Sequence, residues 1–173
     1  GQKESDDVVA SLNWLINEKE IPASKIGIYG SSLGALVGLL TPVKSNNFQA
    51  LAVVDAPFDF ETLVREEMEY QGFPPLLFEP LYHYVLLFER INLLENSPEG
   101  SLEASKKQPI LIFNGLKSDR VLPHHTDDLI KAANDNSIKT EIHRYDVGHT
   151  RVMYEKPDEF SNLLINFFTN ELN

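Results

Sequence analysis

Residues 26–37 read Ile26-Gly27-Ile28-Tyr29-Gly30-Ser31-Ser32-Leu33-Gly34-Ala35-Leu36-Val37. The run is apolar as far as Gly30, breaks into the pattern G-x-S-x-G, and continues as an apolar segment that can form a helix. A serine between a strand and a helix, with a glycine two positions to either side, sits on a strained turn that holds its hydroxyl clear of the sheet. The sequence therefore predicts a sharp strand-turn-helix unit with Ser32 as a candidate nucleophile.

The segments around this unit alternate between short apolar runs and helical periodicity. Strands are expected at residues 25–29, 50–54, 109–114 and 140–145, and helices at about 5–18, 32–40, 123–134 and 156–172. Residues 60–96 are rich in Phe, Tyr, Leu and Glu and read as a helical insert over the sheet edge, whereas residues 97–107 read as a loop. This alternation predicts an α/β fold with a parallel sheet of about four strands.

Composition excludes several classes of protein. The net charge of −11 at pH 7 and the lack of a basic cluster argue against a nucleic-acid groove or binding to an anionic membrane surface. No apolar run approaches the roughly 20 residues that span a bilayer. The chain contains no cysteine, so cysteine usage does not settle the compartment, and we take the cytoplasm as the expectation.

Polar residues follow each expected strand, and the carboxyl ends of parallel strands meet at one edge of the sheet. They are Ser32 after the first strand, Asp55 and Asp59 after the second, Ser118-Asp119-Arg120 after the third, and Gly148-His149 after the fourth. Their order along the chain, serine then acid then histidine, is that of the catalytic triads of α/β-hydrolases. His149 is the candidate general base.

Four segments together make the chain resemble the C-terminal part of the catalytic domain of the prolyl oligopeptidase family of α/β-hydrolases. They read D-D-V-V-A-S-L-N-W-L-I at 6–16, K-I-G-I-Y-G-S-S-L-G at 25–34, G-L-K-S-D-R-V-L-P-H-H at 115–125 and G-H-T at 148–150. The resemblance covers nearly the whole of residues 1–173 and implies a partial α/β-hydrolase fold. It also implies a serine hydrolase of peptides or small acyl esters, with no metal or organic cofactor.

The resemblance also implies a role for each of several residues. Ser32 is the nucleophile, His149 the general base, and the backbone N–H of Leu33 one donor to the oxyanion. Arg120 stands where the peptidases of that family use an arginine to hold a substrate carbonyl.

The sequence departs from the family pattern at the triad acid. The family places this acid three residues before a valine, and counting back from Val121 gives Ser118. Asp119, one residue later, is the expected acid if the loop is re-registered. The alternatives are Asp55 or Asp59, or a site that has no acid.

A second departure concerns the sheet, because the family has four more strands before the serine turn and takes the second oxyanion donor from that part. We therefore expect this chain to be the C-terminal portion of a larger enzyme, inactive or weak alone. Its first strand would leave an unpaired edge, so a homo-oligomer or pairing with the upstream segment is expected.

Three other groups of residues invite a function, and each also has a simpler interpretation. The adjacent pair His124-His125 lacks companions at ligand spacing, so no metal is expected. Tyr82, His83 and Tyr84 are expected to pack within the insert rather than line a pocket, and Glu66, Glu67 and Glu69 to form a solvated helix face.

Two functions therefore remain from the sequence. The leading one is a serine hydrolase, and the alternative is a catalytically silent module that uses the hydrolase fold for binding or assembly.

Overall fold

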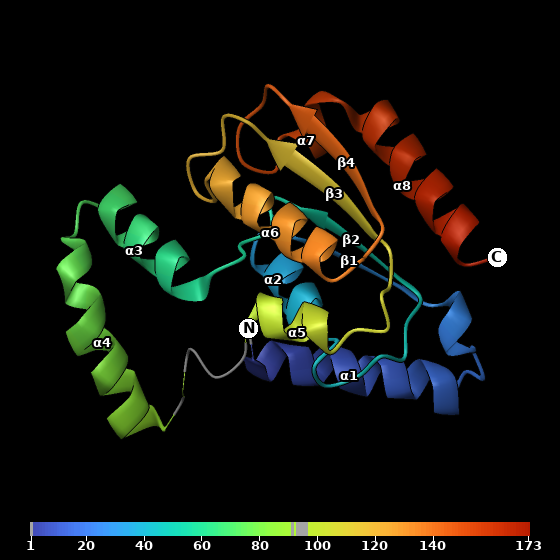
Figure 1. Ribbon diagram of the computed structural model, residues 1–173, viewed down its shortest axis with the longest axis horizontal. Helices are drawn as coiled ribbons and strands as arrows, with labels where there is room; N and C mark the ends of the chain where they lie inside the picture. The colour runs from blue at the N-terminus through green and yellow to red at the C-terminus, as the bar shows by residue number, and fades with distance from the viewer. Residues whose placement is uncertain (1, 91, 93–96) are drawn as a thin grey trace.

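The computed structural model describes residues 2–90, 92 and 97–173, which fold around a four-stranded parallel β-sheet (Figure 1). The strands are β1 (Gly27–Ser31), β2 (Ala50–Val54), β3 (Ile110–Gly115) and β4 (Thr140–Tyr145). They lie in the order β1-β2-β3-β4, and each neighbouring pair is parallel. The α/β class predicted from the sequence is confirmed. The first strand starts two residues later than expected, because residues 23–25 form the 3-10 turn η1 (Ala23–Lys25).

Helices cover both faces of the sheet, as Figure 1 shows. One face carries α2 (Leu33–Leu40), α5 (Pro98–Glu103) and α6 (Pro123–Asp135), with α1 (Gln2–Asn17) packed against α2. The other face carries α7 (Val152–Glu155) and α8 (Pro157–Glu171). The sheet is thus the middle of three layers.

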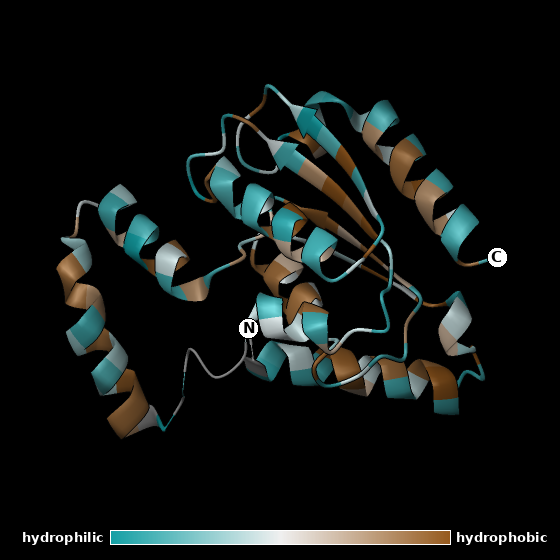
Figure 2. Ribbon diagram, in the orientation of Figure 1, coloured by the Kyte–Doolittle hydropathy of each residue, from teal (hydrophilic) through white to brown (hydrophobic). Residues whose placement is uncertain are grey.

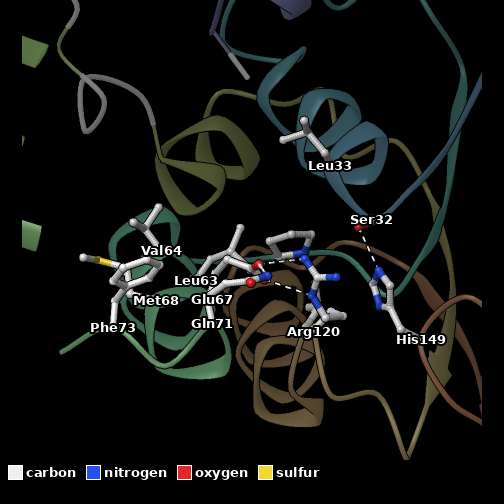
Figure 3. Close-up of a pocket in the computed structure, with 12 residues that line it drawn as sticks. Ser32, Leu33, Leu63, Val64, Glu67, Met68, Gln71, Phe73, Arg120 and His149 are labelled. Atoms are coloured by element: carbon white, nitrogen blue, oxygen red, sulfur yellow. Dashed lines mark hydrogen bonds and ion pairs between the residues drawn. The ribbon is translucent and has the colours of Figure 1, made fainter. Parts of the chain in front are cut away.

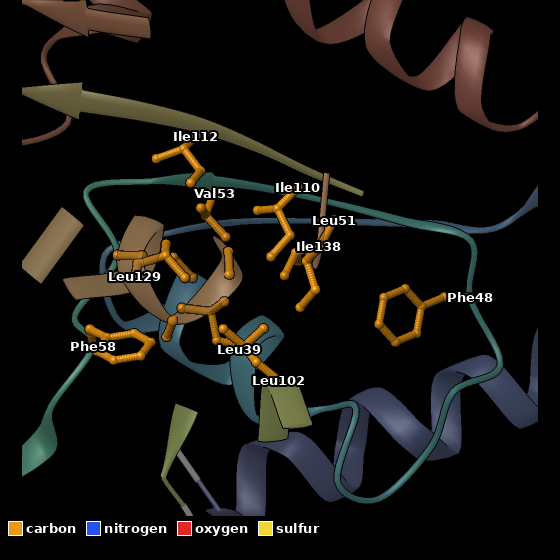
Figure 4. Close-up of a cluster of buried hydrophobic side chains, with 14 of the residues drawn as sticks. Leu39, Phe48, Leu51, Val53, Phe58, Leu102, Ile110, Ile112, Leu129 and Ile138 are labelled. Carbon is orange, nitrogen blue, oxygen red and sulfur yellow. The ribbon is translucent and has the colours of Figure 1, made fainter. Parts of the chain in front are cut away.

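The central strands β2 and β3 are buried along their whole length, as expected of strands covered on both faces. Because successive side chains of a strand point to opposite faces, each of the two strands contributes side chains to two separate hydrophobic cores. The core below α2 and α6 contains Leu51, Val53, Ile110 and Ile112 (Figure 4). The core below α8 contains Ala52, Val54, Leu111 and Phe113. Hydropathy follows the same division, with apolar strands between helices that are polar on their outer sides (Figure 2).

Strand β1 forms one edge of the sheet. The N–H of Gln49 donates to the carbonyl of Ile26, and the N–H of Ser32 donates to the carbonyl of Val54. Backbone groups alternate in direction along a strand, so those of Tyr29 point away from β2. Within the part of the chain that the structure describes, no strand pairs with that side of β1.

The segment expected as a helical insert, residues 60–96, is helical from residue 60 to residue 89 except for its connecting turns. It comprises α3 (Phe60–Tyr70), the 3-10 turn η2 (Pro75–Leu77), α4 (Phe78–Tyr84) and the π-helical turn η3 (Val85–Glu89). Residues 91 and 93–96 of the expected insert lie outside the described residues. The helices α3 and α4 form an arm beside the sheet body (Figure 1).

Two local expectations were wrong. Residues 97–107 are not simply a loop, because Ser97 caps α5 by accepting a hydrogen bond from the N–H of Gly100, and Pro98 occupies the first turn. The first helix also begins at Gln2 and not at the expected residue 5, and Ser5 lies buried inside α1. None of the helices in the described ranges is both long enough and apolar enough to cross a bilayer.

Candidate active site

Ser32 lies on the turn between β1 and α2, where the sequence predicted a strained serine. Its φ of 52° and ψ of −124° belong to a region that residues other than glycine rarely adopt. The turn is tight because α2 passes directly over the end of β1. A Cβ atom on Gly30 would overlap the carbonyl oxygen of Gly34 and lie 2.8 Å from the amide nitrogen of Ala35. Glycine at position 30 is therefore what allows the turn to form.

Gly34, the second glycine of the motif, is different. A Cβ atom at Gly34 would meet no atom within 4 Å. Close packing in this structure therefore explains the first glycine of G-x-S-x-G but not the last.

His149 follows β4 and precedes α7, and its ring reaches the serine turn. The Nε2 atom of His149 lies 2.9 Å from the Oγ atom of Ser32, which is hydrogen-bond distance (Figure 3). The structure thus brings together the two residues that the sequence singled out as nucleophile and base.

The other ring nitrogen of His149 faces Ser118 and Asp55. Its Nδ1 atom lies 3.0 Å from Ser118 Oγ and 3.8 Å from Asp55 Oδ2. Ser118 therefore occupies the hydrogen-bonding position where the family pattern has a carboxylate. Asp55, from the end of β2, places its carboxylate within ion-pair distance of the ring, and this pair is charged only when His149 is protonated.

The structure does not bring Asp119 to His149. Asp119 is exposed, and within the described residues it makes no hydrogen bond or ion pair. The other alternative, Asp59, caps α3 by accepting a hydrogen bond of 2.6 Å from the N–H of Thr62. The part that Asp119 plays in catalysis stays a prediction, and the geometry favours Asp55, which the sequence offered as an alternative.

The surroundings of His149 keep its ring neutral. Burial lowers the pKa of His149 below its usual value, and the charge of Asp55 opposes this effect only in part. A neutral imidazole at neutral pH can accept a proton at Nε2, as a general base must.

Leu33, next to the serine, is the first residue of α2. Its backbone N–H therefore has no acceptor inside the helix, because the first four N–H groups of a helix lack such partners. This N–H lies at the positive end of the helix dipole, which suits it to a developing negative charge.

A cavity of about 540 Å³ opens beside Ser32 and His149 and is walled on its far side by α3. Its apolar lining comprises Leu33, Pro57, Leu63, Val64, Met68, Phe73 and Val121. Tyr82, His83 and Tyr84 do not line it, and Tyr82 instead stacks on Phe78 within the arm. The volume suits a small organic molecule.

Arg120 lines the same cavity but is held by a partner that the sequence did not reveal. Its Nε and Nη2 atoms donate to the two carboxylate oxygens of Glu67, at 2.9 and 2.7 Å (Figure 3). The guanidinium also lies 4.8 Å from the centre of the Tyr70 ring. Glu67 was expected on a solvated helix face, but it faces the cavity because the arm folds back over the β3–α6 loop.

Glu66, His124 and His125 form a second cluster that the sequence did not predict. Their ligand-type atoms lie within 4.8 Å of one another. The Nδ1 atom of buried His125 accepts a hydrogen bond from the N–H of Phe58, so its Nε2 carries the proton and donates to Glu66. His125 thus has no free lone pair for a metal ion, and the cluster acts to hold α3 against α6.

The fold and these contacts define a class of protein. It is an α/β-hydrolase, with a serine on the strand-helix turn and a histidine after the last strand of the sheet. The profile of the prolyl oligopeptidase family matches residues 1–173, so the chain belongs to this family.

Solved structures share the fold at low sequence identity. An esterase from Pyrococcus furiosus is 18% identical, with a TM-score of 0.75 over 100% of this chain and 64% of the esterase. A puromycin-hydrolysing peptidase from Mycobacterium tuberculosis is 18% identical, with a TM-score of 0.75 over 98% of this chain and 26% of the peptidase. An acylaminoacyl peptidase from Pyrococcus horikoshii is 17% identical, with a TM-score of 0.72 over 97% of this chain and 27% of that peptidase.

The chain spans less than two thirds of the length of these solved relatives. A comparison with curated protein sequences finds no match. The family, together with the esterase and peptidase relatives, points to hydrolase function.

Proposed function

We propose that this protein is a serine hydrolase that cleaves a peptide or a small acyl ester. The observation that carries the proposal is the 2.9 Å contact between Ser32 Oγ and His149 Nε2, made by a serine on a strained strand-helix turn. A nucleophile within hydrogen-bond reach of a base is the arrangement that activates serine for acyl transfer.

The reaction runs in two steps. Ser32 Oγ attacks the substrate carbonyl while its proton passes to His149 Nε2, and the Leu33 N–H donates to the oxyanion. The bond to the leaving alcohol or amine then breaks, and the leaving group takes the proton from His149. A water molecule, deprotonated by His149, then attacks the acyl-enzyme. The ester bond to Ser32 breaks, Ser32 Oγ takes the proton back from His149, and the acid is released.

The cavity suits a substrate with an uncharged, largely apolar group next to the scissile bond. Its walls are mostly apolar, and its one arginine, Arg120, is paired with Glu67. A peptide has further carbonyl groups that can accept a hydrogen bond from Arg120. A simple ester has no carbonyl beyond the one that is cleaved. The esterase and the peptidases among the relatives are consistent with either substrate class.

We also propose that the chain is completed by another segment or by a second copy. The outward-facing backbone groups of Tyr29 on β1 have no strand partner among the described residues, and unpaired strand edges promote association. Size-exclusion chromatography with light scattering should show self-association at micromolar concentration. A monomer under those conditions would contradict self-pairing.

The hydrolase proposal is tested with a fluorophosphonate, which reacts with activated serines. The printed chain and a form extended upstream to the length of its solved relatives are treated with the reagent, and mass spectrometry locates the label. Label is expected at Ser32, to be lost in Ser32→Ala and kept in Ser31→Ala, a matched control one residue away. Failure of both forms to react would overturn the proposal.

A second function is favoured by one observation. Ser118 stands at the hydrogen-bonding position beside His149 Nδ1, where the family pattern has an acid. A chain without that acid could serve as a catalytically silent module for binding or assembly. Failure of both forms to label, with the fold intact by circular dichroism, would favour this function.

A further inference from the structure

We propose that the task of the triad acid is divided in this chain between two positioning residues. Ser118 accepts the Nδ1 proton of His149 and so fixes the ring, while the buried carboxylate of Asp55 supplies the negative charge. The inference rests on the proposed function, in which His149 is the general base.

Hydrogen bonding determines what Ser118 does. For Nε2 to accept the proton of Ser32, the neutral ring of His149 must carry its hydrogen on Nδ1. Ser118 Oγ lies 3.0 Å from Nδ1 and therefore accepts this hydrogen. Its second lone pair accepts from the N–H of Val121 at 3.3 Å. Ser118 is 4% exposed, so this arrangement is held inside the protein.

Asp55 differs from Ser118 in distance and in charge. At 3.8 Å its Oδ2 atom is too far from Nδ1 for a hydrogen bond but close enough for electrostatic attraction. Asp55 is 1% exposed, which limits screening by solvent. The attraction favours the imidazolium that forms when His149 takes the proton from Ser32.

A hydrogen-bond network fixes the position of Asp55. Its Oδ1 atom accepts from Asn114 Nδ2 at 3.2 Å and from the N–H of Gly115 at 2.7 Å. Its Oδ2 atom accepts a hydrogen bond of 2.6 Å from the N–H of Thr150, the residue that follows His149. These bonds tie the end of β2 to β3 and to the histidine loop, residues 146–151 between β4 and α7, and they hold the carboxylate beside His149.

Four charged groups face His149 from three parts of the fold. Asp55 comes from the end of β2, Asp119 and Arg120 from the β3–α6 loop, and Glu67 from α3. Burial lowers the pKa of His149, Arg120 lowers it further, and the three acids raise it, Asp55 most strongly. Asp119 is thus the natural control for Asp55, because it carries the same charge without touching the ring.

The test is a titration of His149 followed by NMR, which needs no catalytic activity. Ring nitrogen shifts report which nitrogen carries the proton, and His149→Gln assigns the signal among the five histidines. Ser118→Ala should reduce the fraction of rings that carry the proton on Nδ1. Ser118→Asp should raise the pKa of His149 by about 1 unit or more, since it places a carboxylate at hydrogen-bond distance.

Asp55→Asn should lower the pKa of His149 by about 1 unit, and Asp119→Asn by clearly less. Because Asp55 is a structural acceptor, the double variant Asp55→Asn/Ser118→Asp is included. It should recover a raised pKa, because a carboxylate again faces Nδ1. A larger shift in Asp119→Asn than in Asp55→Asn, or an unchanged proton position in Ser118→Ala, would overturn the inference.

Activity separates this inference from the proposed function. Where ester hydrolysis is measurable, the acid limb of the kcat/KM profile should move in the same order as the NMR pKa values. NMR shifts as expected in a protein that never reacts with fluorophosphonate would leave the division of roles standing and remove the hydrolase function. Labelling at Ser32 with the opposite order of pKa shifts would support the hydrolase function and overturn the division of roles between Ser118 and Asp55.

Discussion

Two regions meet at His149, and they are built in different ways. The β1–α2 turn that carries Ser32 is set by backbone packing, because the lack of a side chain at Gly30 lets the helix pass against the strand, with the serine at a φ of 52°. The β3–α6 loop that carries Ser118 and Arg120 also has backbone bonds, such as that from the Lys117 N–H to the Val147 carbonyl, but it is held in addition by side-chain contacts. These contacts come from the end of β2, from the histidine loop and from α3.

The difference bears on which substitutions each region can accept. The close approach of α2 admits only glycine at position 30, whereas nothing near Gly34 excludes a side chain. Hydrogen bonds between side chains can exchange partners while the backbone stays in place, and here Ser118 contacts the His149 ring while Asp55 lies 3.8 Å from it. The same fold can therefore keep its nucleophile and alter the groups that tune the base.

The largest expected effect is at the turn. Gly30→Ala should lower the free energy of unfolding by about 3 kcal/mol or more, because the added methyl overlaps the backbone of α2 and cannot be relieved by a side-chain movement. Gly34→Ala is the matched control, since its methyl points into open space and alanine favours the helix by about 1 kcal/mol at most. Urea unfolding followed by circular dichroism measures both. Equal losses in the two variants would show that packing at Gly30 does not define the turn.

A smaller effect is expected in the loop, and it concerns activity rather than stability. Arg120→Ala should lower kcat/KM for a peptide about tenfold, as expected for loss of one charged hydrogen bond to the substrate carbonyl, and for a small ester much less. Stability should change by about 1 kcal/mol at most, because Arg120 is 43% exposed. Equal losses for the two substrates would remove the peptide role of Arg120.

Glu67→Gln tests the role of Arg120 by changing its partner instead of the arginine itself. The carboxylate now occupies two of the three nitrogen donors of Arg120, Nε and Nη2, so weakening it should make the guanidinium more available to a substrate carbonyl. We expect peptide turnover to rise by about twofold to tenfold, within the range of one charge-assisted hydrogen bond. A fall in peptide turnover, parallel to that of Arg120→Ala, would mean that the pair acts as a unit.

The sequence predicted the turn, the four parallel strands and the histidine position because each depends on a local pattern. G-x-S-x-G, unbroken apolar runs and Gly148-His149 after a strand can be recognised without knowing the rest of the fold. The contacts of the carboxylates could not be predicted in the same way. Glu67 meets Arg120 across 53 positions, and Asp55 meets Thr150 across 95.

The sequence also did not predict which residue of the β3–α6 loop faces His149, and the structure gives the reason. The N–H of Ser118 donates to the carbonyl of Gly115, and the N–H of Val121 donates to Ser118 Oγ. These two bonds hold Ser118 inward, so Asp119 falls on the exposed side. The re-registered loop that would present Asp119 to His149 does not occur.

The smallest expected effect concerns the pH dependence of stability. Two histidines contribute to it: His149, where the two regions meet, and His125, in α6 directly after the β3–α6 loop. Burial lowers the pKa of His149 and of His125 below the value of about 6.5 that histidine has in the unfolded chain. Below pH 6.5 the unfolded chain therefore binds protons that the folded chain does not. The free energy of unfolding should fall as the pH drops through 6.5 towards the folded pKa values.

Urea unfolding at pH 7.5 and pH 5.5 measures this effect above the range in which carboxylates titrate. His125→Asn should reduce the difference between the two pH values, because one of the two buried histidines is gone. A stability that instead rises from pH 7.5 to pH 5.5 would mean that the charge of Glu66 outweighs the burial of His125, and that the α3–α6 contact gains strength in acid.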